Sequence, residues 1–150
     1  MAFRAIPGIS SSMKYKAINF FGISALLLLP LWLGAQQQQP TEAEEINQLR
    51  EAVDKQVDNY TNMLDLADWQ IFYLDSILTH DYDAMRLELK GLRDAKVGNT
   101  DAYVRAQDKW AEQIYNSLQS IFNEEQWAKY LKSGAARDKK SRDKRAAKRK

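Results

Sequence analysis

The chain has 150 residues, enough for one domain, with a formal net charge of +2 and no cysteine. Disulfide bonds, thiolate metal sites and cysteine nucleophiles are therefore excluded. Hydrophobic residues make up 45% and charged residues 28%, as in folded soluble proteins, and the six glycines and three prolines favour helices over a turn-rich β fold.

The charge is unevenly distributed. Residues 1–35 carry three basic groups and no acid, residues 36–134 carry 10 basic against 18 acidic residues, and residues 135–150 carry 9 basic against 2 acidic residues. An acidic body with a basic tail requires an explanation that a uniform surface would not.

The N-terminal third has the pattern of an export signal. Lys14 and Lys16 precede an uncharged, mostly apolar run, residues 17–33, which ends at Gly34-Ala35. This order predicts a signal peptide over residues 1–35, cleaved near Ala35, and a periplasmic or otherwise extracytoplasmic protein. The alternative, a membrane anchor, needs about 20 apolar residues. Met13 offers an alternative start, with residues 1–12 upstream of it.

The mature part, residues 36–134, shows helical periodicity throughout. Thr41 with Glu44 forms a predicted capping box, and apolar residues then recur at steps of three or four. A second helix is expected from Asp68, and a turn with Gly98 as its left-handed residue leads to a third from Thr100. The stripes comprise Ile46, Leu49, Val53, Val57, Tyr60 and Leu64, then Tyr103, Ala106, Trp110, Ile114, Leu118 and Ile121.

A fourth, short helix is predicted from Asn123, a good N-cap, with Gln126 as the other half of a capping box. No alternating run bounded by turns suggests a strand. The fold class predicted is all-α, an elongated helical hairpin bundle of about four helices. Residues 135–150 contain alanine as their only hydrophobic type and are expected to form a disordered basic tail.

Two helix starts carry a similar motif. Leu66-Ala67 precedes Gln70, and Phe122-Asn123 precedes Gln126, at the same spacing. With the export signal and the helical layout, these stretches resemble the Spy/CpxP family of periplasmic proteins, known for a Leu-Thr-x-x-Gln motif. This chain departs from the motif at Ala67, which has no capping hydroxyl. The resemblance covers about residues 41–132.

The resemblance implies a function as an ATP-independent chaperone or as an envelope-stress adaptor that acts on a sensor kinase. The partners it implies are unfolded or partly folded proteins or the periplasmic domain of the kinase, often with a homodimer as the binding form. The aromatic side chains are either core or a client-binding surface, since both uses suit rings on amphipathic helices. The candidates for client binding are Trp69, Phe72, Tyr73, Tyr103, Trp110 and Trp127.

A metal-responsive sensor is a further alternative. His80, the one histidine, stands next to Asp81 and near Asp83, which together could offer an imidazole and two carboxylates to a divalent ion. Zinc prefers several nitrogen or sulfur ligands, so a solvated charge cluster is the competing interpretation. No cofactor is expected, and no catalytic motif supports an enzyme.

The basic tail behind an export signal argues against nucleic acid as a partner. It could instead tether a structural, envelope-associated protein to an anionic surface, pair with the acidic body, or only maintain solubility. The residues concerned are Arg137, Lys139, Lys140, Arg142, Lys144, Arg145, Lys148, Arg149 and Lys150.

Overall fold

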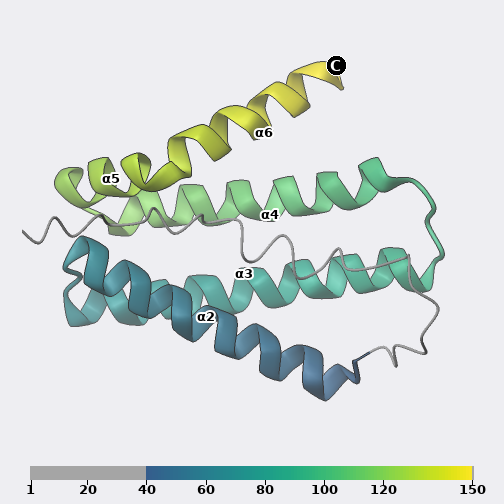
Figure 1. The fold of residues 1–150 in the computed structure, drawn as a ribbon, viewed down its shortest axis with the longest axis horizontal. Coiled ribbons are helices and arrows are strands. Elements are labelled where there is room, and N and C mark those ends of the chain that lie inside the picture. Colours follow the sequence, from purple (N-terminus) through teal and green to yellow (C-terminus); the bar gives the residue numbers. More distant parts are fainter. Residues whose placement is uncertain (1–39, 150) are drawn as a thin grey trace, which may run out of the picture. The chain divides into compact units, whose positions relative to one another are not determined.

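The computed structural model describes residues 40–149, and the predicted signal peptide lies outside them. The described part is all-α, as predicted, with no strand among these residues (Figure 1). Its elements are α2 (Glu42–Leu64), α3 (Asp68–Asp94), α4 (Thr100–Ile121), α5 (Glu124–Tyr130), a π-helical turn η1 (Leu131–Ala135) and α6 (Ala136–Lys148). No helix in this part is both long enough and apolar enough to cross a membrane.

The long helices run back and forth, with α3 packed against both α2 and α4 (Figure 1). The α2–α3 turn has Asp65 in the left-handed conformation, at φ 54°. In the α3–α4 turn the left-handed residue is Lys96, at φ 53°, so the prediction of Gly98 for this role is wrong. The reason is that α3 already ends at Asp94, and the Val97 N–H closes the turn by bonding back to the Leu92 carbonyl. The left-handed residue of this turn therefore lies two positions before Gly98.

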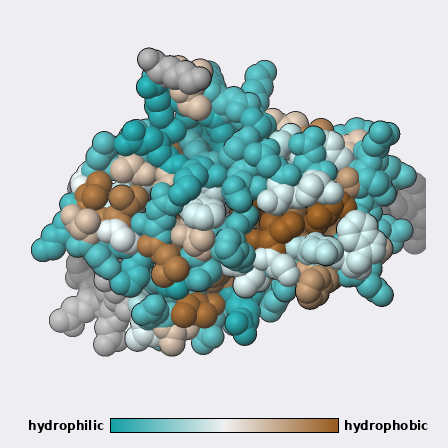
Figure 2. Space-filling model, turned by 180° about the vertical axis from the view of Figure 1, so that it is seen from behind, coloured by the Kyte–Doolittle hydropathy of each residue, from teal (hydrophilic) through white to brown (hydrophobic). Residues whose placement is uncertain are grey.

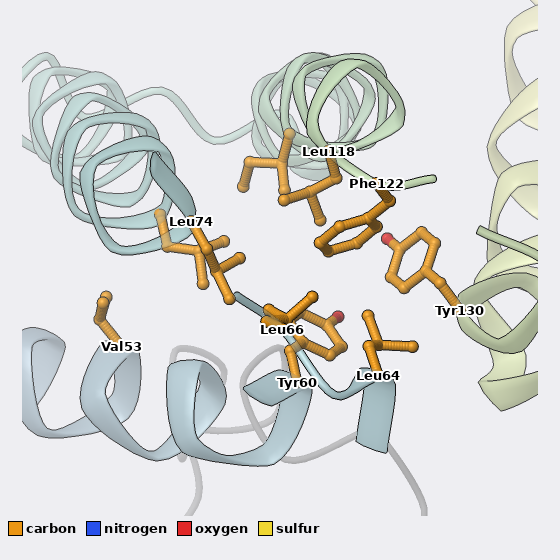
Figure 3. Close-up of a cluster of buried hydrophobic side chains, with 10 residues drawn as sticks. Val53, Tyr60, Leu64, Leu66, Leu74, Leu118, Phe122 and Tyr130 are labelled. Atoms are coloured by element: carbon orange, nitrogen blue, oxygen red, sulfur yellow. The ribbon is translucent and has the colours of Figure 1, made fainter. Parts of the chain in front are cut away.

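The core gathers at the end of the bundle where α2 meets α3 and α4 meets α5. Figure 3 shows Tyr60, Leu66 and Leu74 pointing toward Leu118 and Phe122, which come from the opposite pair of helices. Tyr130 of α5 closes this cluster, with its ring centroid 5.5 Å from that of Tyr60. A cluster of large, interlocking side chains fixes how the two helix pairs meet.

The basic tail differs from the disordered segment expected. Residues 136–148 form α6, which is held against α4 by ion pairs: Arg142 with Glu112, and Arg145 and Arg149 with Asp108. Gly134, at φ 125°, makes the bend that separates α6 from α5. The tail itself has only two acidic residues, so the acids of α4 serve as ion-pair partners for its arginines. These ion pairs hold α6 against the rest of the helical bundle.

Candidate functional site

Both helix starts with the repeated motif use their glutamine as predicted. The Asn123 side chain accepts from the Gln126 N–H at 2.9 Å, and Gln126 Oε1 accepts from the Asn123 N–H at 3.0 Å. At the first start, Gln70 Oε1 likewise accepts from the Ala67 N–H at 3.0 Å. Ala67 has no side-chain acceptor, so this start has only half of a capping box.

The two glutamines also bind each other across the core. Gln70 Nε2 donates to Gln126 Oε1 at 2.7 Å, and Gln126 Nε2 donates to Gln70 Oε1 at 3.0 Å. Each amide donates once more, to the chain just before the other's cap: Gln70 to the Ile121 carbonyl and Gln126 to the Asp65 carbonyl. Both side chains are buried with every amide hydrogen used, which makes the pair a satisfied polar link between the two helix starts.

The two starts are equivalent in their burial. Gln70 and Gln126 are 56 positions apart, and at the same offset Leu66 matches Phe122 and Leu74 matches Tyr130, all of them buried. The motif is thus used twice to place one buried residue before the glutamine and one after it.

At the exposed positions the two starts differ in residue type. The first has Trp69, Phe72 and Tyr73, which are 56%, 68% and 52% exposed. The second has Glu125, Ala128 and Lys129 at the equivalent positions, all exposed as well. We call Trp69, Phe72 and Tyr73 the aromatic trio. Because the same local fold forms with polar or small residues there, packing does not require these rings, and the core interpretation is wrong for them.

The rings of the trio pack on one another in edge-to-face geometry. Tyr73 lies 6.2 Å from Trp69 and 5.7 Å from Phe72, between ring centroids. Contiguous exposed rings are unusual on a small soluble protein and mark an interaction surface. Figure 2 shows, on the face it presents, apolar side chains gathered in strips between hydrophilic ones.

A shallow groove lies between α2 and α3 beside the trio. Its apolar floor is formed by Val57, Ile71 and Phe72, and it is lined by four carboxylates: Asp54, Asp58, Asp68 and Asp75. None of these four has an ion-pair partner among residues 40–149. We call this feature the acidic groove. It joins exposed apolar area to uncompensated negative charge.

The other three aromatic candidates are partly buried. Trp127 is half-buried and lies 4.9 Å from the Tyr115 ring and 5.1 Å from Tyr130, between centroids. Trp110 donates through Nε1 to Glu88 at 2.7 Å, and Tyr103 is half-buried on α4. Among the six predicted client-binding residues, the exposed rings are therefore those of the trio.

Glu88 ties α3 to α4 through two donors. Lys109 Nζ, at 2.8 Å, and Trp110 Nε1 both donate to its Oε2. The hydrogen bond from Lys109 is the main reason that the pKa of the Glu88 carboxyl lies below its usual value, and Trp110 acts in the same direction. Trp110 is thus committed to a structural contact.

The proposed metal ligands do not converge on one site. His80 Nδ1 lies 2.8 Å from Asp81 Oδ1, but the Asp83 carboxylate accepts from Arg86 Nε at 2.8 Å instead. Asp81 is 3% exposed, whereas the His80 side chain is 76% exposed. Across residues 40–149, no group of three or more histidine or acidic side chains is placed to hold a metal ion.

The tail residues fall into two sets. Arg142, Arg145 and Arg149 face α4, and Lys139 pairs with Glu112 and with Asp143. Lys140, Lys144 and Lys148 follow at four-residue steps, so they share one helix face, and they have no ion-pair partner within the described residues. We call these three the lysine face. Arg137 lies beside Asp138, and Lys150 is outside the described residues.

Sequence reasoning missed the buried Leu74 and Leu78 of α3 and the acidic groove. The four-residue step between the two leucines, and between Asp54 and Asp58, was the available signal. In comparisons with known proteins, no family model, no curated protein and no solved structure matches this chain.

Proposed function

We propose that this protein is an exported, ATP-independent chaperone-like or adaptor protein that binds partly folded proteins, or the domain of a sensor kinase, through the aromatic trio. The observation that carries the proposal is the exposure of Trp69, Phe72 and Tyr73 at positions where the equivalent helix start has Glu125, Ala128 and Lys129. The resemblance of the two glutamine motifs to Spy/CpxP proteins and the predicted signal peptide support the same function and location.

Physical considerations favour capture over catalysis. Three neighbouring rings offer a broad apolar contact without a deep enclosed cavity, which suits varied polypeptide segments better than one small molecule. No nucleotide is needed for such binding, since burial of apolar surface drives it. The client is released when its own folding buries the same apolar side chains.

The experiment is an aggregation assay with a chemically denatured client diluted into buffer containing the purified protein. The test variant replaces the trio by the residues of the second start: Trp69→Glu, Phe72→Ala and Tyr73→Lys. We expect the original protein to suppress light scattering at a few-fold excess and the variant to lose most of this effect. The matched control is Met63→Lys on α2, which removes another exposed apolar residue, 37% exposed, outside the trio and outside the acidic groove.

The three-residue variant should remain folded, because surface substitutions of this kind change stability by only about 0.5 kcal/mol each. Circular dichroism and thermal melting check that it is. The chaperone version of the proposal is wrong if the original protein leaves aggregation unchanged. It is also wrong if the folded variant suppresses aggregation as well as the original does.

A second candidate function has its own observation, the lysine face. Three unpaired lysines on one side of α6 suit a protein tethered to an anionic envelope surface, to which each basic residue near the surface contributes about 1 kcal/mol. The test is sedimentation with vesicles containing anionic lipid, comparing the protein with Lys140→Gln/Lys144→Gln/Lys148→Gln. Equal sedimentation of both forms would refute the tether.

A further inference from the structure

We infer that the acidic groove selects the clients of this protein: it binds segments that are both apolar and cationic, and it rejects anionic segments of equal hydrophobicity. The inference rests on the proposed function, because it names the class of polypeptide that the trio's surface receives.

The charge of the groove is the first argument. Asp54 and Asp58 of α2 face Asp68 and Asp75 of α3 across the apolar floor. Acids such as Glu112 and Asp108 have basic partners, whereas these four do not. Glu51 and Glu124 also have no ion-pair partner within the described residues, but they do not line the groove. Lysine or arginine side chains from a partner would supply the four carboxylates of the groove with the basic partners that they lack within the described residues.

The apolar surface is the second argument. Phe72 belongs both to the groove lining and to the trio, so exposed ring area continues directly into the acidic groove. A bound cation next to Trp69 or Tyr73 gains an additional attraction to the ring faces. A purely cationic segment would leave the rings uncovered, and a purely apolar segment would leave the carboxylates unpaired.

The length of the surface is the third argument. A second hollow between α2 and α3 is lined by apolar residues, among them Ile46, Leu49 and Leu87, and by Arg50 and Arg86. Of the two hollows, only the acidic groove therefore has unpaired carboxylates, so a bound segment would place its cationic side chains there and its apolar side chains along the second hollow. Both hollows lie between α2 and α3, and their linings on α2 run from Ile46 to Asp58. Twelve residue steps of helix span about 18 Å, which matches an amphipathic segment of about a dozen residues.

A second copy of the chain is a poorer occupant than such a client. The lysine face is the unpaired basic feature of α6, but the apolar residues of that helix are alanines, which are too small to cover Phe72 and Trp69. The structure therefore favours a partner that supplies both larger apolar side chains and positive charge.

The test measures binding of two fluorescent peptides of about 14 residues, long enough to span the groove as a helix. One contains leucine and lysine with the leucines on one helical face, and the other has glutamate in place of every lysine. Fluorescence anisotropy with the purified protein should show binding of the lysine peptide and at least about tenfold weaker binding of the glutamate peptide, with the preference reduced at high salt.

Two protein variants locate the effect. Asp54→Asn/Asp75→Asn neutralises one carboxylate on each wall of the groove and should weaken the lysine peptide about fivefold, the effect of losing two exposed charge pairs. Glu51→Gln/Glu124→Gln removes the same charge at exposed positions outside the groove and should leave affinity unchanged. Equal weakening by both variants, or equal binding of the two peptides, would overturn the inference.

The outcome separates this inference from the proposed function. If aggregation suppression depends on the trio but acidic and basic clients are protected alike, the selectivity is refuted and the chaperone function stands. If no client is protected, the proposed function fails, and peptide binding then decides the groove on its own. A trio-dependent dimer at the assay concentration, seen by light scattering, would show that a second copy fills the groove and would overturn the inference.

Discussion

The two helix starts, Leu66–Leu74 and Phe122–Tyr130, show which residues this fold requires and which it leaves free. The buried positions agree in both: an apolar side chain, a glutamine, and a second apolar side chain. The exposed positions disagree, with three aromatic rings in the first and Glu125, Ala128 and Lys129 in the second. Residues that agree between the two starts are those that the fold requires, and residues that differ are free to serve another role, so the second start acts as an internal control for the first.

The largest effect should come from the buried positions that the two starts share. Leu74→Ala and Tyr130→Ala each remove a buried side chain, so each should lower the free energy of unfolding by about 2–5 kcal/mol. Urea denaturation followed by circular dichroism measures this change. Phe72→Ala, at an exposed position on the same helix, is the control. A loss as large for Phe72→Ala as for Leu74→Ala would end the distinction between the two classes of position.

The glutamine pair should give the next largest effect. Gln70→Met leaves the Ala67 N–H and the Ile121 carbonyl without their side-chain partner, and it removes the two hydrogen bonds between the Gln70 and Gln126 amides. The expected cost is about 2–3 kcal/mol for this variant and for Gln126→Met. The double variant should lower the free energy of unfolding by less than the sum of the two single variants, since each single variant already removes both hydrogen bonds between the two amides. Additive losses would show that the amides do not act as a unit.

Alkaline pH should destabilise the fold in part through the second start. Burial raises the pKa of Tyr130 to about 12, while the equivalent Leu74 does not titrate. The folded state holds the phenol proton more tightly than the unfolded chain, whose pKa is about 10. The stabilisation is therefore complete below pH 10 and is lost as the pH rises toward 12, by about 1.4 kcal/mol at pH 11.

Denaturation curves at pH 9 and pH 11 test this expectation. Tyr130→Phe keeps the ring and removes the titrating group, so it should lose about 1.4 kcal/mol less than the original protein over that interval. Burial also raises the pKa of Tyr60 and of Tyr82, so the variant should keep a residual dependence on pH. Identical curves for the variant and the original would rule out Tyr130 as a source.

The smallest effect concerns the cap residues, in which the two starts also differ. Asn123→Ala should destabilise by about 1 kcal/mol, because it removes the acceptor of the Gln126 N–H. Ala67→Asn should stabilise by a similar amount, since Ala67 has extended backbone angles, φ −73° and ψ 156°, that suit a capping side chain. Thermal melting should show shifts of opposite sign, and a shift of the same sign in both would contradict the equivalence of the two starts.

The helices and their starts could be predicted from the sequence because they depend on local signals. Thr41 with Glu44 and Asn123 with Gln126 cap their helices as expected, and α3 begins at Asp68. These features need only neighbouring residues and a helical period. The all-α class followed from the same signals.

Which aromatic rings are exposed at the site depends on contacts between segments far apart in the sequence. The helical period of the apolar residues does not predict such contacts. Trp69 and Phe72 match a helical stripe as well as Leu74 does, and only the packing of α4 and α5 decides which of them is covered. The helical tail was missed for a related reason, because its partners Asp108 and Glu112 lie on α4. The high charge of residues 135–150 predicted disorder, but the acidic residues of α4 provide a surface of opposite charge on which this segment forms a helix.

The bond between Gln70 and Gln126 joins residues 56 positions apart. A nascent chain that ends before residue 126 can form α2 and α3, but it cannot complete the hydrogen bonds at the base of α3. The contact between Gln70 and Gln126 joins residues far apart in the sequence, so the entropy of closing the loop between them is lost before their hydrogen bonds can stabilise the fold. Assembly of the first hairpin into its final form therefore waits until the segment that contains Gln126 has been synthesised and has packed against it.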